Sequence, residues 1–153
     1  MWQDEWKRWQ KELAARDPEA LRELEAQSDE EKLEAFAGKM AFGTGGLRSI
    51  LGMGPARMNV YTVARASQGL ADYLNRRFSA PSAVIGYDSR IKSDAFARVT
   101  AGVLAANGVQ VHFWPQLTPV PTVSFATCYL RASAGVMITA SHNPAKYNGY
   151  KAY

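Results

Sequence analysis

A serine, a histidine and a lysine near the end of the chain have the types and the spacing that could support chemistry. Ser141 and His142 follow a short apolar run of strand type, Val136–Ile138, and Lys151 lies a short loop further on. A polar loop just after a strand is where α/β enzymes usually place reactive groups. The same segment also fits a plain surface turn, because Ser, Asn, Pro and Gly are common turn formers.

Two arginines could bring positive charge to such a loop. Arg48 ends the glycine-rich stretch Phe42–Arg48, and Arg90 follows the apolar run Ala83–Tyr87. Glycines let a backbone approach a ligand closely, and a guanidinium matches the geometry of a phosphate. The stretch matches neither the nucleotide-binding P-loop nor the dinucleotide fingerprint. Taken as patterns alone, both arginines fit exposed surface positions as well as they fit an anion-binding role.

Alternating strands and helices must position these residues. We expect strands at 83–87, 109–114 and 134–139, and helices at 93–106 and 122–130, with a preceding helix capped by Asn59. Such alternation predicts an α/β fold with parallel strands, whose carboxyl ends share one edge of the sheet. Asp88–Arg90, Gln116–Thr118 and Ser141–His142 should therefore line one rim. Asp88 suits a cap of the following turn better than a metal ligand, and 147–151 is predicted to be a tight turn.

Residues 1–40 are predicted to form a separate helical extension. Three tryptophans and a leucine follow the spacing of one helix face, Trp2, Trp6, Trp9 and Leu13. Asp17-Pro18 favours a second helix start, and Ser28–Glu31 has capping-box spacing for a third. The apolar positions of that third helix are predicted to be Leu33, Phe36 and Met40. We expect the tryptophans to pack against the body of the protein.

Composition narrows the class of protein. The chain has 153 residues, 47% of them hydrophobic, and a net charge of +4 with dispersed basic residues. This distribution argues against a nucleic-acid partner, and no apolar run is long enough to span a membrane. The polar, acidic start does not fit a secretory signal. A single cysteine, Cys128, fits a reducing compartment, so we expect a cytoplasmic location and a packing role for the thiol.

Phosphoryl transfer fits these residues better than acyl transfer. No acidic residue is placed to orient His142 into a hydrolase triad, and the Gly-x-Ser-x-Gly motif is absent. A transferring phosphoryl group spreads negative charge over its oxygens, which positioned cations stabilise. Two histidines are too few for a histidine-rich metal site.

Taken together, these motifs resemble the α-D-phosphohexomutase superfamily. Thr139–Pro144 is similar to the phosphoserine loop of that family, and the similarity runs from about Ala41 to the last residue. The other matching motifs occur in the family's order: Phe42–Arg48, Gly52–Gly54, Arg57–Asn59, Gly86–Arg90 and Tyr147–Lys151. The chain most resembles the first domain of the phosphoglucomutase/phosphopentomutase branch. Ser49 departs from the pattern, because the family usually has Gly after the arginine.

The resemblance implies a fold and a set of roles. The fold would be a three-layer α/β/α domain with a mostly parallel mixed sheet, spanning 41–153 after the extension 1–40. Ser141 would carry the phosphoryl group and Lys151 would be the general acid/base. Arg48 would contact the phosphoryl group, and His142 and Asn143 would shape the loop and contact substrate or phosphate. The resemblance further implies substrate binding by Thr44, Gly45 and Arg90.

The resemblance also implies a magnesium ion and a sugar bisphosphate. Mg²⁺ would bind oxygens of the phosphoserine at Ser141, and the family's aspartate-rich metal loop has no counterpart in this sequence. We therefore expect a fragment of a phosphosugar mutase, with domain I incomplete and later domains expected to dock, that is inactive by itself. The substrate would be a sugar phosphate, and the residues that would select the sugar lie outside this chain. The alternative is a non-catalytic α/β module that binds anions or a partner protein.

Overall fold

The computed structural model describes residues 1–153 and contains six helices and one five-stranded sheet. The helices and strands follow one another in the order α1 (Trp2–Arg16), α2 (Pro18–Glu25), α3 (Asp29–Phe36), β1 (Leu47–Ile50), α4 (Val60–Arg77), β2 (Ser82–Tyr87), α5 (Ser93–Ala106), β3 (Gln110–Phe113), α6 (Val120–Tyr129), β4 (Ala134–Ile138) and β5 (Tyr147–Ala152).

The sheet is mixed, with the strand order β1-β5-β4-β2-β3. β2 pairs in parallel with both β3 and β4, whereas β5 is antiparallel to both β4 and β1. Four strands therefore run in one direction and β5 alone runs against them. This arrangement confirms the predicted α/β fold with a mostly parallel mixed sheet.

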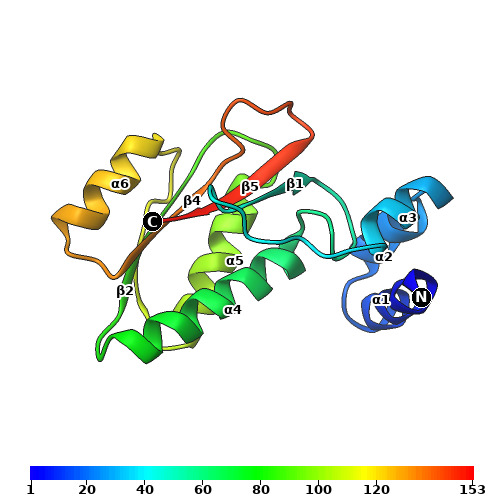
Figure 1. The fold of residues 1–153 in the computed structure, drawn as a ribbon, viewed down its shortest axis with the longest axis horizontal. Coiled ribbons are helices and arrows are strands. Elements are labelled where there is room, and N and C mark those ends of the chain that lie inside the picture. The colour runs from blue at the N-terminus through cyan, green and yellow to red at the C-terminus, as the bar shows by residue number, and fades with distance from the viewer.

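Helices cover both faces of this sheet, which gives the three predicted layers. Figure 1 shows α4 and α5 side by side on one face and α6 on the other. Ile85, Ile138 and Tyr150 point to the α4/α5 face and join its core cluster, while Val84 and Met137 point to α6. This alternation follows from the two-residue period of a strand. Because β2 and β4 are covered on both faces, their sequences are continuously apolar.

Most predicted elements of the α/β part lie where the sequence places them. α5 has the predicted bounds, and α4 starts after Asn59, whose side chain accepts from the backbone N–H groups of Tyr61 and Thr62. α6 begins at Val120, two residues before the predicted start at Thr122, because Pro121 sits inside its first turn.

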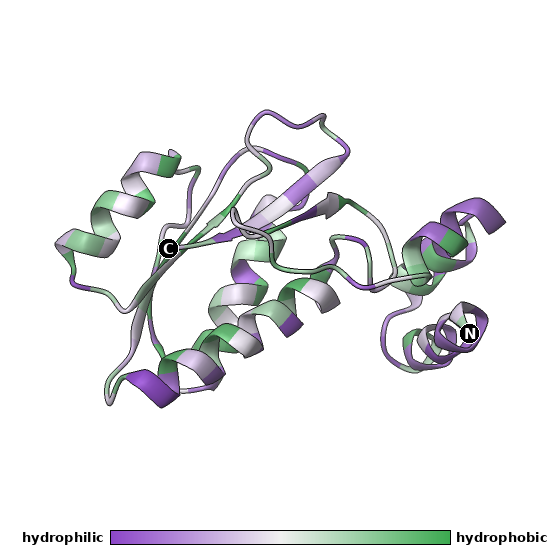
Figure 2. Cartoon of the chain, in the orientation of Figure 1, coloured by the Kyte–Doolittle hydropathy of each residue, from purple (hydrophilic) through white to green (hydrophobic).

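The extension has a small core of its own. Leu13, Leu24 and Phe36 are buried there, and the Trp9 ring contacts both Phe36 and Tyr61 of α4. The expected packing against the body is thus met through Trp9. Two ion pairs add to the attachment, Arg57–Glu34 at 2.7 Å and Lys92–Glu23 at 3.1 Å. Figure 2 shows the mixed polar and apolar surfaces of α1 to α3 that this small core requires.

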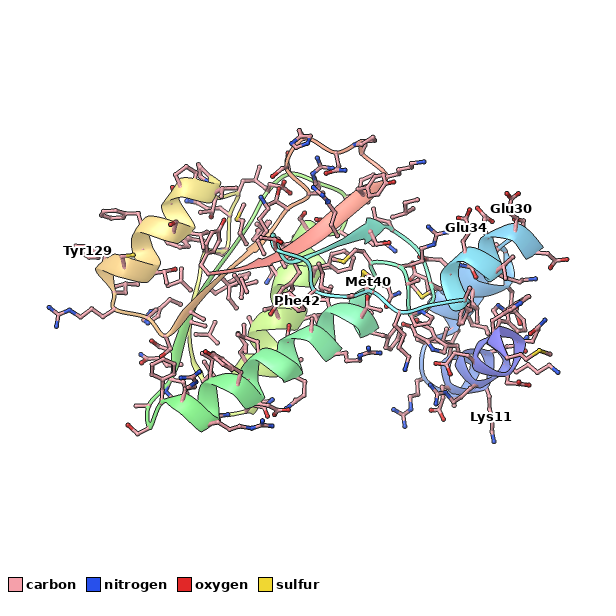
Figure 3. The ribbon with its side chains drawn as sticks, viewed as in Figure 1. Lys11, Glu30, Glu34, Met40, Phe42 and Tyr129 are labelled. Atoms are coloured by element: carbon pink, nitrogen blue, oxygen red, sulfur yellow. The ribbon has the colours of Figure 1, made fainter.

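Both predicted caps of the extension are confirmed, but the third helix is shorter than expected. Asp17 caps α2 and Ser28–Glu31 forms a capping box for α3. α3 ends at Phe36, so Met40 lies outside it, and Leu33 is 48% exposed. Figure 3 shows Met40 on the segment that links the extension to β1, from where it packs against the main core.

Two further predictions need correction, and one strand was not predicted. Tyr147–Lys151 is part of strand β5 and not a tight turn, because pairing on both sides outweighs the turn preference of Asn-Gly. β1 was not predicted, since its four residues follow a glycine-rich loop. Cys128 is exposed on α6 and not packed. It shares that helix's outer surface with Phe125 and Tyr129, and Figure 3 shows Tyr129 pointing away from the sheet.

None of the helices combines the length and the apolar character that a membrane crossing requires.

Candidate active site

Ser141 lies in the loop just beyond β4, and its backbone is unusual. Its φ angle is 53°, in the left-handed region that few residues other than glycine adopt. The backbone N–H of Ser141 donates to the hydroxyl oxygen of Thr139 at 3.0 Å. The residue is exposed, so its hydroxyl is open to solvent and to a ligand.

Lys151 reaches this hydroxyl from the neighbouring strand. Its Nζ donates a hydrogen bond to Ser141 Oγ at 2.7 Å. β5 is fixed in place because Tyr150 points the other way into the core, where Ser67 Oγ donates to its hydroxyl at 3.2 Å. Burial raises the pKa of Tyr150 to about 12, so this anchor remains neutral. The anchored tyrosine thus directs the next side chain toward the serine.

Arg48 approaches the same loop from β1. Its Nη1 donates to Oδ1 of Asn143 at 2.8 Å, and its partner in the β1–β5 register is Gly149. A side chain at Gly149 would meet the carbonyl oxygens of Thr139 and Leu47 at 2.6 and 2.9 Å. The glycine therefore allows three backbone segments to meet close beside the serine loop, and the predicted approach of Arg48 to that loop is what the structure has.

Arg90 has a position that the sequence did not reveal. Its guanidinium donates four hydrogen bonds to backbone carbonyl oxygens of the serine loop and lies 3.5 Å from Asp88 Oδ2 through Nε. All its N–H groups thus face protein oxygens. Substrate contact by Arg90 stays a prediction, and it would require the guanidinium to release loop carbonyls. No sequence signal distinguishes such an arginine from one that faces a ligand.

The remaining predicted residues surround this centre with fewer contacts. His142 is exposed and its imidazole makes no hydrogen bond within the chain. Thr44 and Gly45 are exposed on a tight turn closed by reciprocal backbone hydrogen bonds between Gly43 and Gly46. Their roles in substrate binding remain predictions. Asp88 caps the following turn as expected, since its Oδ1 accepts from the backbone N–H of Arg90 at 3.1 Å.

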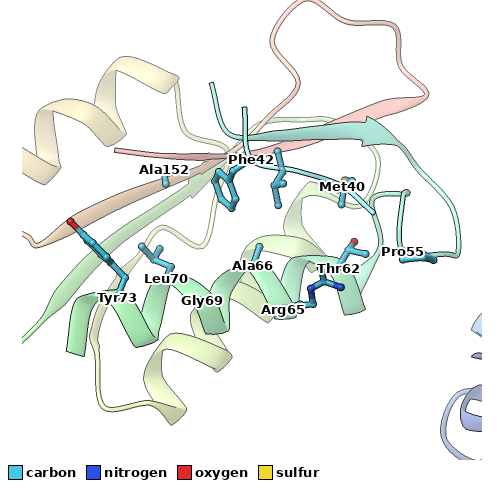
Figure 4. Close-up of a pocket in the computed structure, with 11 residues that line it drawn as sticks. Met40, Phe42, Pro55, Thr62, Arg65, Ala66, Gly69, Leu70, Tyr73 and Ala152 are labelled. Atoms are coloured by element: carbon cyan, nitrogen blue, oxygen red, sulfur yellow. The ribbon is translucent and has the colours of Figure 1, made fainter. Parts of the chain in front are cut away.

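A hollow of about 430 Å³ adjoins Ser141 and Asn143 and extends along Asp88–Ile91. The predicted rim thus forms between the ends of β2 and β4, whereas Gln116–Thr118 does not line the hollow. A larger groove of about 570 Å³ lies elsewhere, between α4 and the β1/β5 edge (Figure 4). That groove is mostly apolar and contains none of the predicted site residues. Ser141 borders the smaller hollow, and Lys151 and Arg48 reach the serine loop from outside its lining, so we assign the chemistry to the serine loop.

The residues of this chain do not form a magnesium site by themselves. No cluster of three or more His, Cys, Asp or Glu that could hold a metal occurs in it. The carboxylate that borders the hollow, Asp88, is already engaged with Thr139, Ser93 and Arg90. Mg²⁺ favours near-octahedral oxygen coordination, for which a phosphate on Ser141 would supply only part of the ligands.

The fold and the site define a class of protein. They describe a three-layer α/β/α domain that presents a serine hydroxyl beside an ammonium and a guanidinium, an arrangement suited to phosphoryl transfer. The sequence model of the family described as "Phosphoglucomutase/phosphomannomutase, alpha/beta/alpha domain I" matches residues 39–153. The chain belongs to this family.

Individual relatives agree with this assignment. The chain is 46% identical over 129 residues to a phosphoglucomutase of Staphylococcus saprophyticus, covering 84% of this chain and 23% of the relative. It is 52% identical over 120 residues to a protein of Schizosaccharomyces pombe named as a probable phosphoribomutase, covering 75% of this chain and 20% of the relative.

A solved structure from Thermus thermophilus, assigned by name as a phosphomannomutase, superimposes with a TM-score of 0.69 at 37% identity. That match covers 75% of this chain and 25% of the other. The chain thus spans about a quarter or less of the length of these relatives.

Proposed function

We propose that residues 41–153 act as the serine-bearing first domain of a phosphosugar mutase, which moves a phosphoryl group between C1 and C6, or C5, of a sugar phosphate. The observation that carries this proposal is the hydrogen bond between Lys151 Nζ and Ser141 Oγ, on an exposed loop that Arg48 also reaches. The family membership and the names of the relatives support the same reaction class.

The proposed step starts from phosphorylated Ser141. The Oγ–P bond breaks while a bond forms between phosphorus and a hydroxyl oxygen of the sugar phosphate. Lys151 gives a proton to the departing Oγ and then takes the proton that the sugar hydroxyl loses. One amine therefore serves both oxygens. The products of the step are a sugar bisphosphate and Ser141 with a free hydroxyl.

The reverse step restores the enzyme. The bisphosphate turns around, and Ser141 Oγ attacks its other phosphoryl group while that P–O bond to the sugar breaks. Arg48 would stabilise the charge on the phosphoryl oxygens, since an exposed guanidinium offers paired N–H donors in the geometry of a phosphate. Mg²⁺ would bind the phosphoserine oxygens together with ligands from outside residues 1–153.

The test is phosphorylation of this chain. The protein is incubated with glucose 1,6-bisphosphate and Mg²⁺, and its intact mass is measured. A gain of one phosphoryl group in the native chain, absent in Ser141→Ala and retained in Ser124→Ala on the exposed side of α6, supports the proposal. A folded chain that gains no such mass favours a passive fragment, and the role of Ser141 is then decided in a longer chain.

In a longer chain that contains the remaining domains, Ser141→Ala should abolish mutase turnover. Retained turnover in that variant would contradict the role of this serine.

A further inference from the structure

The strained backbone of the reactive serine requires an explanation from its surroundings. Ser141 has a positive φ, a conformation that residues with a Cβ keep only where neighbouring contacts hold them. Glycine would adopt the same backbone freely but could carry no phosphoryl group. Contacts other than the residue's own preference must therefore hold this loop.

Arg90 supplies the larger part of those contacts. Its Nη2 donates to the carbonyl oxygens of Ser141 at 2.6 Å and Asn143 at 2.7 Å. Its Nη1 donates to those of Pro144 and Tyr147, each at 3.1 Å. The side chain is only 14% exposed, so the loop closes around the guanidinium. One planar group thus fixes four carbonyls between the end of β4 and the start of β5.

Asp88 supplies a second connection through Thr139. Its Oδ2 accepts the hydrogen of the Thr139 hydroxyl, whose oxygen in turn accepts the backbone N–H of Ser141. A hydroxyl has one hydrogen, so donation to Asp88 leaves its lone pairs for the serine N–H. The other oxygen of Asp88, Oδ1, accepts hydrogen bonds from Ser93 Oγ at 2.9 Å and from the backbone N–H of Arg90 at 3.1 Å.

These two connections start from one place. Asp88 and Arg90 both follow β2, which pairs with β4 in a fixed parallel register. The positive charge of Arg90 is balanced by Asp88 and by the carbonyl dipoles, so the side chain is engaged in holding the loop and is not free to bind an anion.

We propose that Arg90 and Asp88 are positioning residues that hold Ser141 in its left-handed conformation, Arg90 through the loop carbonyls and Asp88 through the Thr139 hydroxyl. The effect on catalysis rests on the phosphoryl transfer proposed above, whereas the holding of the loop can be measured without it. This positioning role requires no contact of either residue with the substrate. Both keep Oγ beside Lys151 during repeated gain and loss of a phosphoryl group.

The experiment measures amide hydrogen exchange by NMR on the full 153-residue chain without any phosphoryl donor. Three loop amides are hydrogen-bonded and report the loop, those of Ser141, Asn143 and Tyr147. In Arg90→Gln, all three should exchange roughly tenfold faster or more, while amides in α4 and α5 keep their rates. Arg90→Lys should show the same acceleration, because an ammonium keeps the charge but not the fork.

Thr139 provides an independent variant that leaves Arg90 in place. In Thr139→Val the Ser141 amide should exchange faster while that of Tyr147 does not, and Thr139→Ser should restore the native rate. Arg76→Gln is the matched control, because Arg76 is exposed and its side chain makes no hydrogen bond. Native loop exchange in a folded Arg90→Gln chain, or in Thr139→Val, would overturn the proposal.

Phosphorylation of Ser141, measured separately by mass, distinguishes the two proposals. Loop exchange that responds as described in a chain that is never phosphorylated supports the positioning roles, and the proposed function then fails only if Ser141→Ala retains mutase turnover in the longer chain. A phosphorylated native chain whose Arg90→Gln variant accepts the group at the native rate overturns the positioning roles alone. A clearly slower gain of the group in that variant supports both.

Discussion

Lys151 Nζ lies 2.7 Å from Ser141 Oγ, although the two residues are separated by an entire loop of the chain. Antiparallel pairing of β4 and β5 returns the chain to the point that it has just left, and it places Lys151 opposite Met137. Ser141 and Lys151 therefore lie in a single hairpin, and a substitution within this hairpin tests the proposed catalysis.

Replacing Lys151 by methionine roughly keeps the length of the side chain and removes the amine that carries the transferable proton. Transfer of a phosphoryl group to and from Ser141 should slow by about 10²–10⁴-fold, the usual contribution of a positioned acid or base. Quenched-flow mass measurement of the adduct gives the rate. Lys146→Met is the matched control, since Lys146 is an exposed lysine of the same loop whose amine makes no hydrogen bond. An equal effect of both substitutions would contradict a specific role for Lys151.

Gly46 cannot accept a side chain without movement of the backbone. Its φ is 104°, and a Cβ there would overlap the carbonyl oxygen of Tyr150. Gly46→Ala should lower the free energy of unfolding by about 2–4 kcal/mol, as measured by urea denaturation. Gly69→Ala is the control within α4, where a Cβ would meet nothing within 4 Å. That change should raise stability by up to about 1 kcal/mol, and similar losses in both variants would contradict the steric argument.

Asn59 combines a helix cap with support for the glycine-rich segment before it. Its Oδ1 accepts from the N–H groups of Tyr61 and Thr62, while its Nδ2 donates to the carbonyl oxygens of Gly52 and Gly54. Asn59→Ala should cost about 2–4 kcal/mol, because the cap is lost and buried carbonyls lose a donor. Exposed Asn75→Ala, which loses one hydrogen bond to the Asn107 carbonyl oxygen, should cost only about 0.5–1.5 kcal/mol. Thermal unfolding of the two variants compares them directly.

Asp17 should make stability depend on pH at the joint between extension and body. The Ala20 N–H and the Tyr61 hydroxyl both donate to its carboxylate, and these hydrogen bonds hold its pKa below the ordinary 3.8. Since the folded pKa is the lower one, the stabilisation is present above pH 3.8 and is lost as the pH falls through the folded pKa.

Asp17→Asn keeps a capping oxygen but does not titrate. The difference in unfolding free energy between the native chain and this variant should therefore shrink as the pH is lowered from neutral to below 3.8. A difference that stays constant across this range in urea titrations would show that the charge of Asp17 contributes nothing.

The sequence predicts the fold best where local preferences and tertiary packing agree. The bounds of α5 follow from an apolar periodicity closed by Asn107-Gly108, and the structure keeps them. β5 shows the opposite case, because Asn148-Gly149 favours a turn by its backbone preferences. There, partners on both sides of the strand decide the conformation, and no local pattern reports those partners.

The site divides in the same way. Lys151 can be placed near Ser141 from its closeness in the chain and Arg48 from the family motifs, and the structure brings both there. The burial of Arg90 within the loop could not be predicted, because residue type indicates a charge but not which oxygens surround it. The exposure of Cys128 was missed for a related reason, since α6 is apolar on its outer surface as well.

The pairing of Met137 with Lys151 has a consequence for how this hairpin can vary. Successive side chains of a strand point to opposite faces, so a one-residue insertion or deletion inside β5, between Tyr147 and Tyr150, would turn the ammonium into the hydrophobic core. The spacing of residues along β5 therefore decides whether the ammonium faces the serine. The loop before Tyr147 can change in sequence over time, but β5 cannot slip by one residue against β4 without removing the lysine from the serine.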